Sequence, residues 1–88
     1  MPVVATIKTD WFRVISDINR QGISLKEIAR ELDVSKSAVI GWRAGAEPGH
    51  GKGEALIEFW QLVTRRPRDA LPVNVTSRRF VYLGRDKC

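Results

Sequence analysis

The chain has 88 residues, of which 43% are hydrophobic and 28% are charged, and this composition is typical of one small folded domain. Its single cysteine, Cys88, excludes an internal disulfide, and one cysteine with one histidine is too few for a zinc site. No stretch approaches the ~20 apolar residues of a membrane helix, and the N-terminus lacks the basic start of a signal peptide. We therefore expect a soluble, cytoplasmic protein without a cofactor, a metal or a membrane partner.

The basic residues are concentrated toward the C-terminal end. The chain has 15 Lys and Arg against 10 Asp and Glu, which gives a net charge of +5. Residues 1–58 hold eight basic and eight acidic side chains, whereas residues 59–88 hold seven and two. A basic segment attached to a neutral domain favours a polyanionic partner, although a solvated charged tail has the same composition.

The N-terminal quarter predicts a short strand and then a helix. Residues 3–7 are rich in β-branched side chains, which favour extended backbone. Thr9 or Asp10 is suited to cap the following helix, and Gly22 is suited to end it. Apolar residues recur at helical spacing between these signals and predict one broad buried face: Trp11, Phe12, Val14, Ile15 and Ile18.

Two short helices with clear start signals come next. Ser24 and Glu27 have the spacing of a capping box, in which each side chain accepts a hydrogen bond from the other residue's backbone N–H. After a tight turn at residues 33–34, Ser35 caps a helix over residues 36–43, and Gly45 ends it. The first of these helices has one apolar stripe, formed by Leu25, Ile28, Ala29 and Leu32.

The rest of the chain predicts a loop, a helix and an extended segment. Residues 44–53 include four glycines and read as a loop. A helix is expected over residues 54–64, where Pro67 prevents its continuation, and residues 68–71 form one more turn. Its apolar face is expected to contain Leu56, Phe59, Trp60 and Val63.

The segment Leu25–Arg43 resembles the helix-turn-helix of lambda-repressor-like and Cro-like regulators. Ala29 must be small because the next helix crosses over it, and Val34 fills the turn. Asp33 stands where the family often has glycine, and aspartate tolerates a left-handed backbone better than most residues. The residues that carry the resemblance are Leu25, Ile28, Ala29, Leu32, Val34, Ser35, Val39 and Trp42.

The resemblance implies a mainly α fold of four to five helices with a short C-terminal strand, in which residues 1–72 form a DNA-binding domain. It further implies that helix 36–43 lies in the major groove of double-stranded DNA. The residues expected to contact bases are Lys36, Ser37, Ile40 and Gly41. Residues expected to contact phosphates are Ser35, Arg43, His50, Lys52, Arg78 and Arg79. We expect a sequence-specific transcriptional regulator, such as a phage or bacterial repressor.

The C-terminal extension, residues 73–88, is interpreted as a dimerisation strand followed by a basic tail. Residues 73–83 pair either with residues 3–7 or with the same segment of a second subunit. Their apolar end is too hydrophobic to be left bare and predicts a dimer interface: Phe80, Val81, Tyr82 and Leu83. A symmetric homodimer would read a palindromic operator with two copies of the reading helix.

Other functions are less well supported by the sequence. A single His50 and a single Cys88 provide no catalytic dyad, so we do not expect an enzyme or a small-molecule ligand. Three alternatives remain open. The helices would serve as a DNA-binding accessory module of a recombinase, transposase or phage packaging complex, as a protein-interaction adaptor, or as a small bundle without a ligand.

Overall fold

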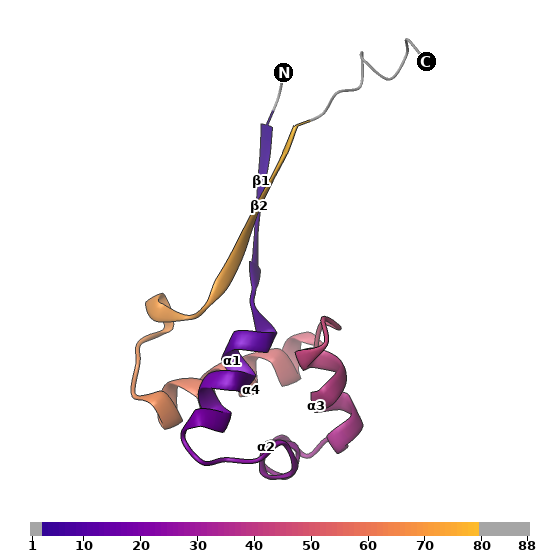
Figure 1. The fold of residues 1–88 in the computed structure, drawn as a ribbon, viewed down its shortest axis with the longest axis vertical. Helices are drawn as coiled ribbons and strands as arrows, with labels where there is room; N and C mark the ends of the chain where they lie inside the picture. Colours follow the sequence, from indigo (N-terminus) through magenta and orange to yellow (C-terminus); the bar gives the residue numbers. More distant parts are fainter. Residues whose placement is uncertain (1–2, 80–88) are drawn as a thin grey trace.

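The computed structural model describes the backbone of residues 3–79 and the side chains of residues 7–75. Within this part, four helices form a compact body, and a two-stranded antiparallel ribbon projects from it (Figure 1). The elements in chain order are β1 Val3–Thr9, α1 Trp11–Arg20, α2 Leu25–Leu32, α3 Lys36–Arg43, α4 His50–Thr64, the 3₁₀ turn η1 Arg68–Ala70, and β2 Val73–Arg79. The predicted mainly helical class with a small sheet is confirmed.

The start signals found in the sequence are confirmed by the hydrogen bonds. The Asp10 carboxylate accepts from the backbone N–H of Arg13 at 3.1 Å and caps α1. Ser24 and Glu27 form both bonds of the capping box, at 2.9 and 3.1 Å. The Ser35 hydroxyl accepts from the N–H of the third residue of α3 at 3.1 Å. These side chains satisfy backbone donors that the helices cannot satisfy internally.

The core lies between α1, α2, α3 and the middle of α4. Buried side chains from each helix meet there: Val14, Ile15, Ile18, Ile28, Ala29, Leu32, Val39, Trp42, Leu56 and Trp60. The expectation that Phe12 is buried is wrong, because its side chain is 56% exposed. Positions 11, 14, 15 and 18 follow the spacing of one helix face, and position 12 lies about 100° away from position 11.

Helix α4 begins at His50, four residues before the predicted start. Glycine lowers helix propensity, and three glycines over residues 49–53 therefore predicted a loop. The first turn forms because it packs: Gly53 is buried, and a Cβ atom added to it would lie 3.4 Å from the Trp11 ring. Lys52 strengthens this packing, since its Nζ donates to the backbone oxygen of Leu32 at 2.7 Å. The loop between α3 and α4 is correspondingly shorter than predicted.

The ribbon settles how residues 73–79 pair. β2 runs antiparallel to β1 of the same chain, with Val73 opposite Thr9 and Arg79 opposite Val3. Its base is held to the start of α1, where the N–H of Asp10 donates to the oxygen of Pro72 at 2.9 Å. The predicted dimer-interface residues Phe80, Val81, Tyr82 and Leu83 lie outside the described residues.

Candidate nucleic-acid interface

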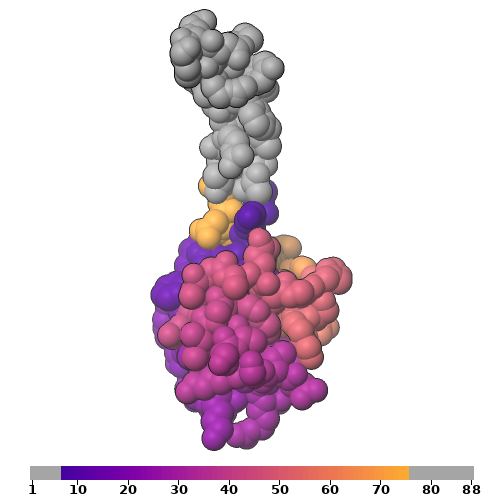
Figure 2. Space-filling view, turned by 90° about the vertical axis from the view of Figure 1, so that its right-hand side faces the viewer, coloured from indigo at the N-terminus to yellow at the C-terminus, as the bar shows by residue number. Residues whose placement is uncertain are grey.

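Helix α3 has a buried inner face and an exposed outer face. Val39 and Trp42 point into the core, with exposed fractions of 0% and 8%. Lys36, Ser37 and Ile40 are exposed on the other side, where helical geometry places residues three and four apart next to each other. Figure 2 looks onto this side, where the magenta and pink surface of α3 and its following loop lies between α2 and the base of the ribbon.

The turn between α2 and α3 fixes the start of α3. Asp33 has the left-handed backbone that was expected, with φ of 55°. The N–H of Val34 donates to the oxygen of Ala29 at 2.9 Å, and Ala29 is only 4% exposed beneath the third helix. Figure 1 shows α2 nearly end-on and α3 running across the view, so the two helices cross steeply.

The C-terminal end of α3 is also closed by backbone hydrogen bonds. The N–H of Ala44 donates to the oxygen of Ile40 at 3.0 Å, and that of Ala46 donates to the oxygen of Gly41 at 2.9 Å. Gly45 follows with φ of 123°, a conformation that favours glycine. With both ends closed and one face in the core, α3 presents its outer residues from a fixed support.

The outer face of α3 is basic and free of carboxylates. No acidic residue occurs from Ser35 to Ala46. Lys36 and Arg43 lie at opposite ends of the helix, are both exposed, and take no part in the ion pairs formed among residues 7–75. This arrangement leaves both cations available to an anionic partner, and it places an exposed isoleucine, Ile40, between them.

The structure places two residues that sequence reasoning missed next to the outer face of α3. Lys8 of β1 and Asn74 of β2 line a groove of about 370 Å³ together with Arg43 at the end of α3. Lys8 and Asn74 are 66 positions apart in the chain, so only the pairing of β1 with β2 brings them together. No local pattern around either residue signals that position.

The predicted phosphate contacts lie in different places. Arg43 is exposed at the end of α3, whereas the Lys52 ammonium is bound to the end of α2, as described above. His50 is in the first turn of α4 and lines a neighbouring hollow with Glu54 and Arg68. Ser35 is exposed at the start of α3, where its hydroxyl oxygen is the helix cap.

Part of the basic excess of the C-terminal third is used within the fold. Both terminal nitrogens of Arg68 donate to the Glu54 carboxylate at 2.9 Å. The Arg66 guanidinium lies 5.7 Å from the Trp60 ring centre and 3.8 Å from the Asp17 carboxylate. Both arginines thus have carboxylate partners on α1 and α4.

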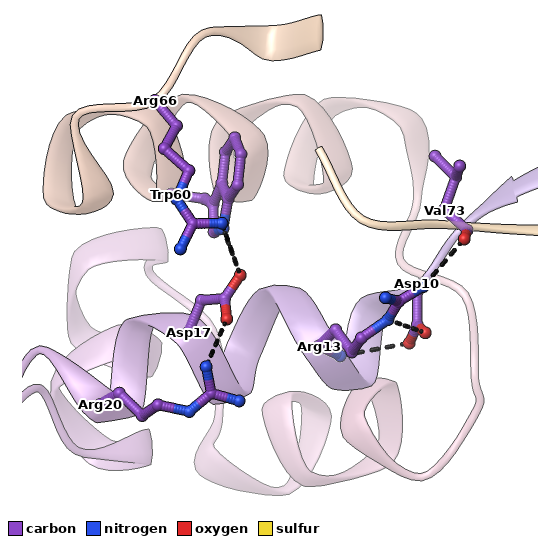
Figure 3. A network of polar contacts seen from close by, with 7 residues as sticks. All are labelled: Asp10, Arg13, Asp17, Arg20, Trp60, Arg66 and Val73. Carbon is purple, nitrogen blue, oxygen red and sulfur yellow. Dashed lines mark hydrogen bonds and ion pairs between the residues drawn. The ribbon is translucent and has the colours of Figure 1, made fainter. Parts of the chain in front are cut away.

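Asp17 is the buried polar residue that sequence reasoning did not identify. Its carboxylate accepts from Trp60 Nε1 at 3.1 Å and from Arg20 at 3.0 Å, and its side chain is about 9% exposed (Figure 3). A buried carboxylate is tolerated when it is paired and hydrogen-bonded in this way. The contacts join α1 to α4, so we assign Asp17 to the fold and not to the interface.

Among the residues whose side chains the structure describes, three carboxyl groups have lowered pKa values. The Arg13 side chain, which donates to Asp10 at 2.7 Å, lowers the pKa of that carboxyl. The backbone N–H of Ser24 lowers the pKa of Glu27, and the Arg68 guanidinium lowers that of Glu54. Each lowered pKa favours the charged form of the carboxyl group, whereas a carboxylic general acid requires a raised pKa. The three groups act as caps and ion-pair partners.

Comparison of the chain with protein-family models, with curated proteins and with solved structures gave no significant match. Among residues 3–79, no helix has the length and the apolar character needed to cross a membrane. The chemistry of the α3 face is therefore the basis on which function is inferred.

Proposed function

We propose that the chain is a sequence-specific DNA-binding regulator in which α2 and α3 form a helix-turn-helix and α3 enters the major groove. The observation that carries the proposal is the outer face of α3, which is exposed, basic and without a carboxylate while its inner face is locked in the core. This is the combination that lambda-repressor-like and Cro-like reading helices require. A phage or bacterial repressor is the proposed biological setting.

Three of the exposed residues of α3 each match a chemical feature of the major groove. Lys36, at the first position of the helix, is suited to donate to guanine O6 and N7. Ser37 donates or accepts and so adapts to several bases. Ile40 is 42% exposed, which is unfavourable in water but suits contact with a thymine methyl group.

Gly41 supports the same placement. A Cβ atom added there would meet only the Cβ atom of Ala46, at 3.9 Å, which is ordinary van der Waals contact. Alanine would thus fit the fold and would favour the helix by about 1 kcal/mol. Since the fold does not require glycine, we propose that DNA does, because the missing side chain lets the helix backbone approach the groove closely.

A homodimer reading a palindromic operator is part of the proposal. One reading helix offers only a few base contacts, and each good bidentate pair gives about 1–3 kcal/mol of discrimination. Two copies, placed about one DNA turn apart, would supply the affinity and specificity that one copy lacks.

The test is in vitro selection of bound sequences from a random double-stranded library, using the full chain. We expect an enriched motif, and we expect Lys36→Ala and Ser37→Ala each to relax the preference at one or two positions by about 5- to 150-fold. Arg20→Gln, which removes an exposed cation on α1, is the control and should select the wild-type motif. Failure of the wild-type chain to enrich any sequence would reject the proposal and favour an adaptor role.

A further inference from the structure

The ribbon separates its residues into two sides of different chemistry. The register pairs Ile7 with Val75 and Lys8 with Asn74, and neighbouring residues of a strand face opposite sides. Ile7 and Val75 are 68% and 62% exposed and make one side apolar. Lys8 and Asn74 make the other side polar.

Arg78 and Arg79, which were predicted to contact phosphates, lie opposite Val4 and Val3 in the register. Their side chains lie outside the described residues.

The polar side is continuous with the surface of α3. Lys8 and Asn74 line the groove that also contains Trp42, Arg43 and Gly45 at the C-terminal end of that helix. In Figure 2 the base of the ribbon lies directly above this part of the surface. A ligand that covers α3 and extends toward the ribbon would meet Lys8 next after Arg43.

We propose that the polar side of the ribbon is a second DNA-binding surface, on which Lys8 and Asn74 bind phosphates flanking the segment that α3 contacts. The inference rests on the proposed function. Seven residues give the ribbon a length of about 20 Å at ~3.3 Å per residue. Phosphates of one strand follow each other by about 3.4 Å along the DNA axis, so the ribbon is long enough to follow several of them.

Glu47 is the group that competes with DNA for Lys8. The Glu47 carboxylate lies 3.4 Å from the Lys8 ammonium, and both side chains are 64% exposed. Exposed ion pairs contribute only about 0–1 kcal/mol, so a phosphate can take the place of this carboxylate. Glu47 also lines the groove and repels an approaching phosphate. Its removal should therefore strengthen binding.

The direction of the ribbon is fixed by Arg13 at its base (Figure 3). The Arg13 side chain donates to the Asp10 carboxylate at 2.7 Å and to the oxygen of Val73 at 3.0 Å, joining the start of α1 to the start of β2. A ribbon tied to the helices in this way presents Lys8 at a constant position relative to α3. Less ordering is then needed when DNA binds.

The test measures affinity for the selected DNA site against salt concentration by fluorescence anisotropy, with full-chain variants. Lys8→Gln should reduce the slope of log affinity against log salt by about 1 and leave the selected motif unchanged. Arg20→Gln makes the same charge change on α1, away from the ribbon, and should keep the wild-type slope. Glu47→Gln should tighten binding several-fold at low salt.

Two results would overturn the inference without touching the proposed function. A Lys8→Gln slope equal to that of the wild type would show that the ribbon does not contact phosphates, even though Lys36→Ala still relaxes the motif. Trimming the DNA flanks to the selected motif should also abolish the difference between wild type and Lys8→Gln. If that difference persists on trimmed DNA, Lys8 acts through the body of the protein and not through flanking phosphates.

Discussion

Replacement of Gly41 by alanine is expected to stabilise the fold and weaken DNA binding at the same time. Gly41 has ordinary helical backbone in the middle of α3, so alanine introduces no backbone strain. The added Cβ atom has 3.9 Å to its nearest neighbour outside the helix. The helix-propensity difference of about 1 kcal/mol should therefore appear almost fully in the free energy of unfolding.

The expected size of each effect follows from these contacts. For a domain of this length, about 1 kcal/mol corresponds to an increase of roughly 4–8 °C in Tm, measured by circular dichroism. DNA binding should weaken by about fivefold or more, because a methyl group would separate the helix from the groove, and about 1 kcal/mol corresponds to that factor.

The matched control is Gly51→Ala. Gly51 is also helical, in the first turn of α4, and a Cβ atom there would meet nothing within 4 Å. This variant should be stabilised as well but should bind DNA like the wild type. If Gly41→Ala raises Tm and leaves affinity unchanged, Gly41 does not face DNA. If it lowers Tm, the packing argument itself is wrong.

Two further predictions concern the stability of the fold. Asp17→Ala should lower the free energy of unfolding in urea by about 1–3 kcal/mol, because it leaves the buried indole N–H of Trp60 without its acceptor; an unchanged urea midpoint would show that the bond is dispensable. The pKa of Asp10 is lowered in the folded state, so its stabilisation is complete above about pH 4.5 and is lost as pH falls through the lowered pKa. The decline in urea midpoint below about pH 4 should be shallower in Asp10→Asn, which keeps a good helix cap, and an equally steep decline would assign the acid sensitivity to other carboxylates.

The sequence predicted best the features that depend on neighbouring residues. The capping box of Ser24 and Glu27, the cap at Ser35 and the left-handed backbone of Asp33 each involve groups within a few positions of one another. Their geometry is determined locally, so residue type and spacing are sufficient. The same reasoning correctly assigned the inner and outer faces of α3.

Features that depend on distant residues could not be predicted in the same way. Strand propensity in residues 3–7 and 73–83 does not show whether each strand pairs within the same chain or with a second copy. The structure was needed to show that β1 and β2 of one chain pair with each other. The early start of α4 depends on the fit of Gly53 against Trp11. Asp17 looked like an ordinary polar residue beside an apolar stripe until Trp60, 43 positions later, supplied its partner.

The distribution of basic residues shows why net charge alone is a poor guide to the interface. The C-terminal third holds the whole excess of positive charge, yet Arg66 and Arg68 are used to stabilise α4 and its surroundings. The exposed cations near the proposed reading surface come instead from two separate elements, with Lys8 on β1 and Lys36 and Arg43 on α3. They lie in a segment of zero net charge, where the carboxylates are largely used for caps and ion pairs. At contact distance DNA is attracted by the local electrostatic potential and not by the net charge of the whole chain. It would therefore bind the part of the chain whose net charge is zero.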